Sequence, residues 1–228
     1  MTYDAKENWN KEFMNTEMAW PAEYVIRIFK GEYPNLHLKK NGFENKKICD
    51  VGCGDGRNLV VLNQCGFDLY GIEITDFIVD KTKNNLDKAG VEKVDLRVGS
   101  NDTIPYEDNF FDYLLSWNSC YYMGDKEDFS EYVKEYARVL KKDGYLVLSI
   151  PKKTCFIFKG SDVKRPGYNI IREDPLNIRN GEILRIFEDE NEIEEAFGSH
   201  FKNFIFGDTH DNCFGYNYHW HLVVCQKK

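Results

Sequence analysis

A short apolar run that leads straight into three closely spaced glycines constrains this fold more than any other feature of the sequence. Residues 47–58 read KICDVGCGDGRN, in which residues 48–51 form the apolar run. Gly52, Gly54 and Gly56 can adopt positive φ without a Cβ clash, and they let a ligand approach the backbone closely. The helix expected after them leaves N–H groups free in its first turn. The stretch therefore predicts a strand, a glycine turn and a helix that bind a ligand against the main chain.

The spacing of the glycines and two carboxylates restricts the class of ligand. The pattern is Gly-x-Gly-x-Gly with Asp55 inside it, whereas the dinucleotide fingerprint is Gly-x-Gly-x-x-Gly around a pyrophosphate, which a carboxylate would repel. Asp50 ends the strand before the turn, and Glu73 lies near the end of a second expected strand at residues 68–74. A carboxylate at that place can accept hydrogen bonds from a ribose diol. We therefore expect a ligand with a ribose, no phosphate and a positively charged end.

At these residues the chain resembles a known family. Residues 50–56 are similar to the first motif of the class I S-adenosylmethionine-dependent methyltransferases, and Glu73 matches the acidic residue that ends their second strand. Three further segments resemble the family's third-strand loop, the start of its fourth strand and its fifth-strand region: residues 99–106, 109–112 and 138–149. The resemblance covers residues 44–150. It implies S-adenosylmethionine as cofactor, S-adenosylhomocysteine as product, and methyltransferase activity of the EC 2.1.1 class.

The resemblance also implies roles for residues that follow the expected strands. The backbone of residues 52–54 would pack against the cofactor, with Asp50 near its amino group and Glu73 on the ribose hydroxyls. Residues 100–102 would meet the adenine, and the residues after the fourth strand would lie beneath the sulfonium. The cofactor-binding residues expected in this way are Asp50, Gly52, Cys53, Gly54, Asn58, Glu73, Ile74, Asn101, Asp102, Trp117 and Asn118.

Ser100 departs from the family pattern. Many relatives carry an acidic residue directly after the glycine that corresponds to Gly99, and that carboxylate accepts a hydrogen bond from the adenine amino group. A serine hydroxyl is a weaker acceptor, so Asn101 or Asp102 would take over this role. The sequence leaves both open.

The rest of the chain predicts a doubly wound α/β fold. The expected helices are residues 57–64, 76–89 and 125–140, and the further expected strands are residues 94–98, 111–116 and 145–150. Strands separated by helices imply a mainly parallel sheet with helices on both faces. The link between two later strand-like runs, residues 201–207 and 218–225, is too short for a helical crossover, so these runs should pair antiparallel. We expect seven strands in the sheet with the last one antiparallel, as the resemblance also implies.

The expected fold is a single domain with four parts. Residues 1–43 form an N-terminal helical cap, and residues 44–150 form the cofactor-binding core. Residues 151–188 interrupt the alternation of elements and read as an insertion. Because the insertion begins at the carboxyl end of a strand, it starts on the ligand side of the sheet. A lid and a solvated decoration are both open interpretations. Residues 189–228 supply a C-terminal helix and the strand pair.

The residues that carry the chemistry are less well defined than those that hold the cofactor. Methyl transfer is an in-line displacement, so the protein mainly aligns a nucleophile and excludes water. An oxygen nucleophile often needs a general base, and histidine is the usual one. The catalytic residue is left unknown, with His210, His219 and Tyr121 as candidates, and His221 reads as a packing residue. Candidate walls of an acceptor pocket are Trp20, Tyr24, Tyr122, Tyr216 and Tyr218. Packing in the core is the competing interpretation for each of them.

Charge and cysteine spacing restrict the partners. The 228-residue chain has a formal net charge of −8 and no visible lysine–arginine cluster, which disfavours a nucleic acid or an anionic membrane as partner. We therefore expect a small-molecule acceptor. The seven cysteines contain no Cys-x-x-Cys pair, so no metal is expected. The absence of a signal-like or membrane-spanning apolar run predicts a cytoplasmic protein.

Two alternatives remain beside the methyltransferase. The first is a non-catalytic member of the same fold that binds the cofactor and acts as a partner or regulator. The second, less favoured by the glycine spacing, is an NAD-dependent oxidoreductase. The sequence leaves the acceptor atom (O, N, C or S) and the oligomeric state undefined.

Overall fold

A computed structural model of the protein describes residues 4–36, 38 and 42–228. The first three residues of the expected cap, and residues 37 and 39–41 within it, lie outside the described residues. The cap contains the two expected helices, α1 (Ala5–Asn15) and α2 (Glu23–Lys30). Asp4 caps α1 by accepting hydrogen bonds from two backbone N–H groups of its first turn. In the part of the chain described here, no helix is long and apolar enough to cross a membrane.

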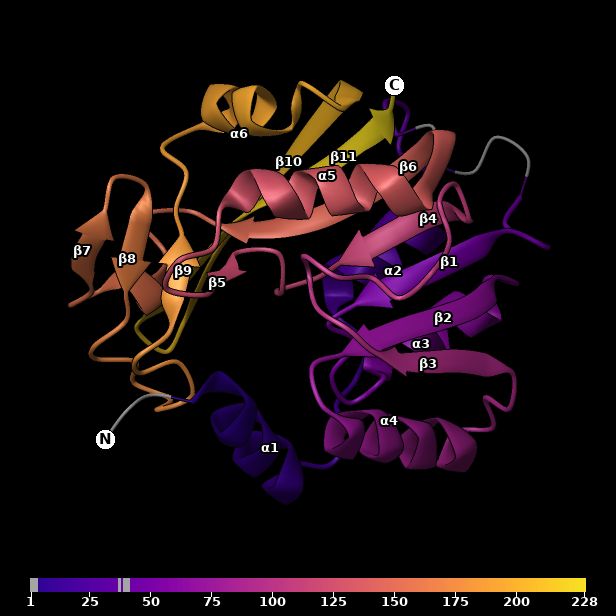
Figure 1. The fold of residues 1–228 in the computed structure, drawn as a ribbon, viewed down its shortest axis with the longest axis horizontal. Helices are drawn as coiled ribbons and strands as arrows, with labels where there is room; N and C mark the ends of the chain where they lie inside the picture. The colour runs from indigo at the N-terminus through magenta and orange to yellow at the C-terminus, as the bar shows by residue number, and fades with distance from the viewer. Residues whose placement is uncertain (1–3, 37, 39–41) are drawn as a thin grey trace.

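A seven-stranded sheet in the order β10-β11-β6-β4-β1-β2-β3 forms the centre of the molecule (Figure 1). Its strands are β1 (Lys47–Val51), β2 (Asp68–Glu73), β3 (Val94–Val98), β4 (Phe111–Ser116), β6 (Leu140–Pro151), β10 (Phe201–Cys213) and β11 (Tyr216–Lys227). Strands β3, β2, β1, β4 and β6 pair parallel, and β11 is antiparallel to both β6 and β10. The expected mainly parallel sheet with an antiparallel last strand is confirmed.

Helices cover both faces of this sheet. They are α3 (Arg57–Gln64), α4 (Asp76–Lys88), α5 (Phe129–Val139) and α6 (Glu190–Phe197). One apolar core joins α2, α3 and α4 to the sheet through buried residues such as Phe29, Leu62 and Leu86. The other core joins α5 and α6 to the opposite face through residues such as Tyr136 and Phe197. The carboxyl ends of the parallel strands are left at one edge, where loops of the two faces meet.

Three elements differ in extent from the sequence prediction. Helix α5 begins four residues later than expected, because Asp128 caps it by accepting a hydrogen bond from Ser130 N. Strand β6 begins at Leu140 rather than at residue 145, since Leu140 already pairs with Phe111. The hairpin β10–β11 extends to a tight turn at Phe214 and Gly215, whose φ values of 52° and 93° are positive. Such two-residue turns fit the twist of paired strands, so the polar link that the sequence suggested is mostly strand.

The insertion is more ordered than the sequence indicated. It contains η1 (Phe156–Phe158), β7 (Asp162–Arg165), β8 (Tyr168–Ile170) and β9 (Ile183–Arg185). These strands join β5 (Tyr122–Met123), just after β4, in a second sheet ordered β5-β9-β8-β7. Leu184 pairs with Tyr122 and is fully buried. The second sheet was not predicted, because its strands are short and its partner strand lies outside the insertion.

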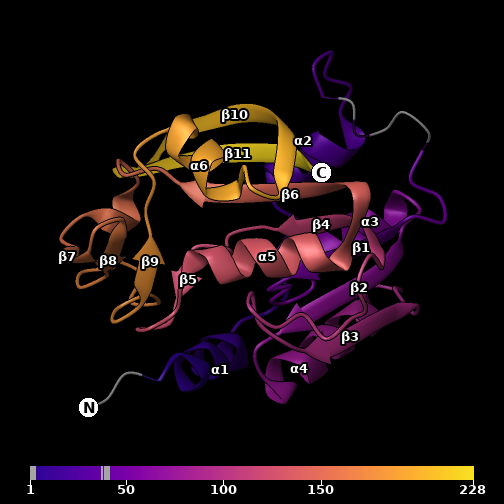
Figure 2. The same ribbon diagram turned by 45° about the horizontal axis from the view of Figure 1, so that its top comes forward.

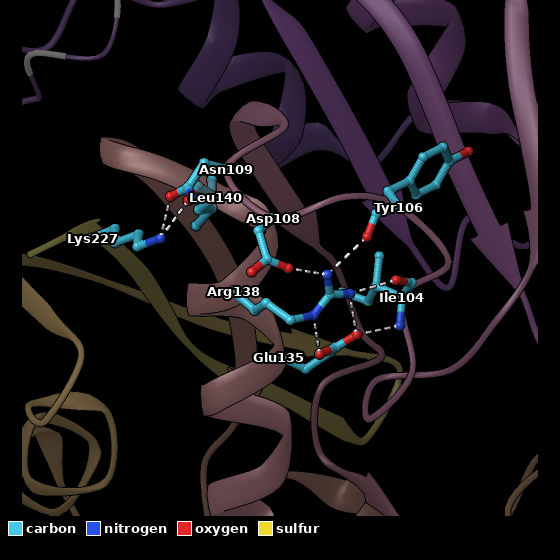
Figure 3. A network of polar contacts seen from close by, with 8 residues as sticks. All are labelled: Ile104, Tyr106, Asp108, Asn109, Glu135, Arg138, Leu140 and Lys227. Atoms are coloured by element: carbon cyan, nitrogen blue, oxygen red, sulfur yellow. Dashed lines mark hydrogen bonds and ion pairs between the residues drawn. The ribbon is translucent and has the colours of Figure 1, made fainter.

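A network around Arg138 of α5 fixes the connection between β3 and β4 (Figure 3). The Arg138 guanidinium donates to the carbonyl oxygens of Ile104 and Tyr106 and to the carboxylate of Glu135. Glu135 in turn accepts from Ile104 N at 2.7 Å. No helix lies between β3 and β4, and these hydrogen bonds hold residues 99–110 in place instead. The loop thus presents a defined backbone at the edge where the strands end.

Candidate active site

The glycine turn, residues 52–56, packs closely against the end of β2. Its three glycines have φ values of 74°, 58° and 87°, which L side chains adopt only with strain. Gly52 N and Cys53 N both donate to the Ile72 carbonyl oxygen, at 3.0 and 3.1 Å. A Cβ atom on Gly52 would lie 2.7 Å from the Ser119 Cβ. Glycine is therefore required at position 52 by close packing as well as by conformation.

Glu73 connects the end of β2 to the glycine turn. Its Oε1 accepts from Gly54 N at 2.8 Å, and its Oε2 accepts from Ile74 N at 2.9 Å. The side chain is buried; burial raises the pKa of Glu73, and the two backbone N–H groups oppose that rise. Each carboxylate oxygen keeps capacity for a further hydrogen bond. The Glu73 carboxylate therefore lies beside the glycine turn, which is where a carboxylate that binds the ribose is expected.

Asp50 is a buried carboxylate whose charge is only partly compensated by its surroundings. It is 1% exposed, and neither of its oxygens has a hydrogen-bond partner of good geometry among the described residues. Burial raises the pKa of Asp50 well above its usual value, and the nearby Glu73 adds to the rise, while Arg57 and the Asn58 side chain oppose it. An unpaired buried carboxylate is costly. A cationic group placed beside it, such as the ammonium of an amino acid, would relieve that cost. The Asp50 carboxylate therefore fits the amino-acid end of the expected cofactor.

Asn58 and Asp55 hold a different part of the chain. Asn58 Oδ1 accepts from Ala22 N at 3.1 Å, and Asp55 Oδ2 accepts from Ala19 N at 2.8 Å. Both side chains are buried. They tie the segment between α1 and α2 to the first turn of α3. Asn58, predicted to touch the cofactor, therefore has a structural partner of its own.

The loop after β3 distinguishes the two candidates for the adenine. Asn101 uses both ends of its amide, because Nδ2 donates to Ser119 O at 3.2 Å and Oδ1 accepts from Tyr136 Oη at 2.6 Å. Asp102 is exposed and accepts a hydrogen bond from the Ser100 hydroxyl. Asn101 thus positions the loop with both ends of its amide occupied, whereas the exposed Asp102 keeps capacity to accept further hydrogen bonds.

The segment after β4 touches the glycine turn through Ser119. The Ser119 hydroxyl donates to Val51 O and contacts the Ser116 hydroxyl at 2.7 Å. Asn118 has a positive φ of 58° and bonds Ser149 through both its backbone N–H and its side-chain oxygen. Trp117 is 9% exposed and packs in the core beside α2 and α3. Sequence reasoning missed Ser119, although a small residue after a strand facing a glycine was the available signal.

Helix α1 lies beside α4 (Figure 2) and contacts both the glycine turn and the insertion. A Cβ atom on Gly54 would lie 3.1 Å from the ring of Phe13. One helical turn away, Trp9 Nε1 donates to Glu182 Oε1 at 2.9 Å, and the Trp9 ring meets the Tyr122 ring edge-on at 5.4 Å. At the C-terminal end of α1, the Lys81 ammonium of α4 donates to the carbonyl oxygens of Phe13 and Thr16. No local pattern in the sequence indicates these partners, because they are distant along the chain.

The residues expected to wall an acceptor pocket are placed in different surroundings. Tyr122 is packed under α1, and Tyr216 and Tyr218 lie against Phe156 of η1, with ring centroids 5.5 and 4.8 Å apart. Trp20 is 90% exposed, so it does not wall an enclosed pocket in this structure. Burial raises the pKa of Tyr24, and Asp211 of the hairpin adds to the rise, which places the hairpin near α2.

The candidate bases contact one another rather than the glycine turn. The His210 and His219 ring centroids are 3.6 Å apart, and His219 Nδ1 lies 2.7 Å from the Thr154 hydroxyl. Burial lowers the pKa of His221 to about 4, as befits a packing residue. Tyr121 is 1% exposed and stacks on Tyr122, and burial raises its pKa well above the usual value. These contacts assign a general base to none of the candidates, and their roles stay predictions.

Comparison with known proteins identifies the family of this chain. A family model described as a methyltransferase domain matches residues 43–195. The chain belongs to the methyltransferase domain family, as a class I, S-adenosylmethionine-dependent member. Its cofactor is accordingly S-adenosylmethionine. A crystal structure of an S-adenosylmethionine-dependent methyltransferase from Methanosarcina mazei superposes with a TM-score of 0.67 at 22% identity, over 86% of this chain and 98% of that one. This likeness shows the fold.

Two curated relatives of this methyltransferase differ in what their names state. A protein of Bacillus subtilis, YxjB, provisionally named a 23S rRNA (guanine-N(1)-)-methyltransferase, is 34% identical over 52% of this chain and 38% of its own length. The ubiquinone biosynthesis O-methyltransferase of Pelagibacter ubique is 26% identical over 62% of this chain and 55% of its own length. The chain thus spans only about half or less of these relatives, and their names disagree on the acceptor.

Proposed function

We propose that this methyltransferase transfers a methyl group from S-adenosylmethionine to a small-molecule acceptor. The observation that carries the proposal is the pair of buried carboxylates at neighbouring strand ends. Glu73 bonds the glycine turn at Gly54 N, and Asp50 beside it has no partner among the described residues. When bound, S-adenosylmethionine supplies a methyl group that its sulfonium has already activated for displacement.

The chain's own residues then have to bind, orient and exclude water. In this proposal Asp50 holds the ammonium, Glu73 accepts from the ribose hydroxyls, and Asp102 accepts from the adenine amino group. Helix α1 and the second sheet close the side of the turn where the acceptor would lie. A closed site strengthens the electrostatic contacts inside it and keeps water from the reacting atoms.

A small-molecule acceptor is supported by the charge of the chain. The net charge is −8, and nucleic-acid binding depends strongly on lysine and arginine contacts to phosphates. The O-methyltransferase name of the Pelagibacter relative agrees with a small molecule, whereas the YxjB name raises 23S rRNA as the competing acceptor. A non-catalytic cofactor-binding protein is the other alternative, because the structure assigns no general base.

Two measurements test this proposal. Isothermal titration calorimetry should show binding of both S-adenosylmethionine and S-adenosylhomocysteine, and no binding of NADH. Release of S-adenosylhomocysteine should then be measured with a panel of low-molecular-weight amines, phenols, thiols and acids, and in parallel with 23S rRNA. Turnover with a panel member supports the proposal. Turnover with rRNA alone, or cofactor binding without turnover on either, contradicts it.

A further inference from the structure

Arg179, in the loop between β8 and β9, is a buried cation with a fixed orientation. Its Nε donates to the Tyr122 hydroxyl at 3.0 Å, and its Nη1 donates to Asp174 Oδ2 at 3.1 Å. The Arg179 side chain is 18% exposed and that of Asp174 is fully buried. Two partners on different elements therefore hold the guanidinium plane in one position.

Asp174 is itself anchored by the main chain. Its carboxylate accepts from the backbone N–H groups of Leu176, Ile178 and Arg179, at 3.3, 3.1 and 2.9 Å. Three backbone donors from one loop fix the position of this buried carboxylate. Asp174 therefore acts as a positioning residue for Arg179, and it does not depend on the guanidinium alone.

Part of the Arg179 guanidinium is left without partners among the described residues. A guanidinium carries five N–H groups, and Arg179 uses Nε–H and one Nη1–H in bonds to described residues. The second Nη1–H and both Nη2–H groups have no acceptor among the residues that the structure describes. Two nitrogens side by side on one edge match the two oxygens of a carboxylate, in a bidentate pair that is stronger than a neutral hydrogen bond.

The Arg179 guanidinium contacts the segment after β4 through the Tyr122 hydroxyl, and its charge acts on tyrosines of two segments. Burial raises the pKa of Tyr121, Tyr122 and Tyr218, and the Arg179 guanidinium opposes the rise in each. It therefore lies near both the segment after β4 and the final strand. Tyr122 also contacts Trp9 of α1.

The aromatic side chains of α1 continue this connection toward the cofactor. Trp9 and Phe13 have ring centroids 6.1 Å apart, and Phe13 lies against Gly54. A layer of aromatic side chains thus separates the guanidinium from the glycine turn. An acceptor that lies along this layer would have one end toward the turn and the other toward Arg179.

We propose that Arg179 is a specificity-determining residue that binds a carboxylate group of the methyl acceptor. The inference rests on the proposed function and adds the acceptor's chemical class, a small carboxylic acid. A phosphate group fits less well, because Asp174 already shares the guanidinium charge. A dianion there would face the Asp174 carboxylate with two negative charges, whereas a carboxylate brings only one.

The direct test uses the wild-type protein saturated with S-adenosylhomocysteine and the arginine side-chain 15N–1H signals. Benzoate and acetate are titrated against their uncharged partners, benzamide and acetamide. The Arg179 Nε–H signal should shift in a saturable way with a carboxylate and not with the amides. Arg172 of the same insertion, which is exposed and paired with Asp162 at 2.8 Å, is the internal control. An Arg179 signal that follows Arg172, or responds equally to the amides, overturns the inference.

A matched pair of variants gives the second test. Arg179→Lys keeps the charge beside Asp174 but removes the planar fork, so it should lower carboxylate affinity about ten-fold or more and leave S-adenosylhomocysteine affinity unchanged. Arg172→Lys should change neither. Equal effects of the two variants, or tighter binding of inorganic phosphate than of either carboxylate, overturn the inference. Failure of S-adenosylhomocysteine to bind the wild-type protein would instead contradict the proposed function.

Discussion

The two sides of the glycine turn are held by different kinds of contact. On the β2 side, Glu73 bonds the backbone N–H of Gly54, only 19 positions away in the sequence. On the insertion side, side chains meet over long separations: Trp9 and Glu182 are 173 positions apart, and Tyr122 and Arg179 are 57 apart. A site made from the main chain of neighbouring strands serves a constant ligand. A site made from distant side chains can vary with the acceptor, and its members have no fixed spacing.

The largest expected effect comes from filling the turn itself. Gly54→Val places a branched side chain at positive φ and directs its Cβ at Phe13. We expect S-adenosylhomocysteine affinity to fall about 100-fold or more, measured by calorimetry. Gly90→Val is the control, because Gly90 has a φ of 76° but nothing within 4 Å of its Cβ position. Similar losses in both variants would mean that general strain, not close approach, explains the effect.

Removing the carboxylate at the end of β2 should have the next largest effect. Glu73→Ala deletes the charged acceptor and also releases Gly54 N, so affinity for S-adenosylhomocysteine should fall about 10- to 100-fold. Asp68→Ala, an exposed residue at the other end of β2, should have no effect. If the Glu73 variant binds S-adenosylhomocysteine as tightly as the wild-type protein, Glu73 does not bind the ribose. The β2 side of the turn would then not be the cofactor side that the comparison assumes.

The pH dependence of S-adenosylhomocysteine affinity tests the role of Asp50 on the cofactor side of the turn. Its pKa is raised by burial and by Glu73, and an ammonium beside it favours the ionised form. Affinity for S-adenosylhomocysteine should therefore fall as the pH drops toward the raised pKa, and binding should release a proton. Calorimetry in buffers of different ionisation enthalpy measures that proton. In Asp50→Asn the release should diminish and affinity should drop about ten-fold, with any remaining pH dependence coming from Glu73.

A proton count that is the same in Asp50→Asn and in the wild-type protein would contradict the role of Asp50. The ammonium would then lie elsewhere, and the unpartnered carboxylate would need another explanation.

The smallest expected effect concerns the end of α1 that is bonded to α4. Lys81→Ala removes the donor to the carbonyl oxygens of Phe13 and Thr16. S-adenosylhomocysteine should then dissociate about 2- to 10-fold faster, as stopped-flow fluorescence of Trp9 would measure. Lys83→Ala, on an exposed position of the same helix, is the control. Equal rates for the two variants would show that α1 does not limit release.

The sequence was sufficient for the core because its signals there are local. Three glycines, at positions 52, 54 and 56, follow an apolar run, and a carboxylate lies at the end of the next strand. These patterns are short-range, so they predict the same local structure whatever the rest of the chain does. The bounds of α3 and β4 match the prediction because periodicity and glycine spacing determine them. The antiparallel pairing of the last two strands followed from the length of their link.

What the sequence could not predict depends on partners that are distant along the chain. Nothing near Asn101 shows that Ser119 and Tyr136 will occupy its amide. The strands that the insertion contributes to the second sheet are three or four residues long, and one of them, β9, pairs with β5, which belongs to another segment. Arg179 reads as an ordinary surface charge until Asp174 and Tyr122 are seen around it. Periodicity does not encode such contacts.

Helix α1 touches Lys81 and Gly54 at one end and Glu182 and Tyr122 at the other, and this has a thermodynamic consequence. A ligand that changes the position of α1 on either side changes it for both. Linkage is reciprocal, so if the cofactor alters the affinity for the acceptor by some factor, the acceptor must alter the affinity for the cofactor by that same factor. The total free energy of binding both ligands is the same in either order, as in any protein; the helix would supply the coupling by which the first ligand changes the affinity for the second.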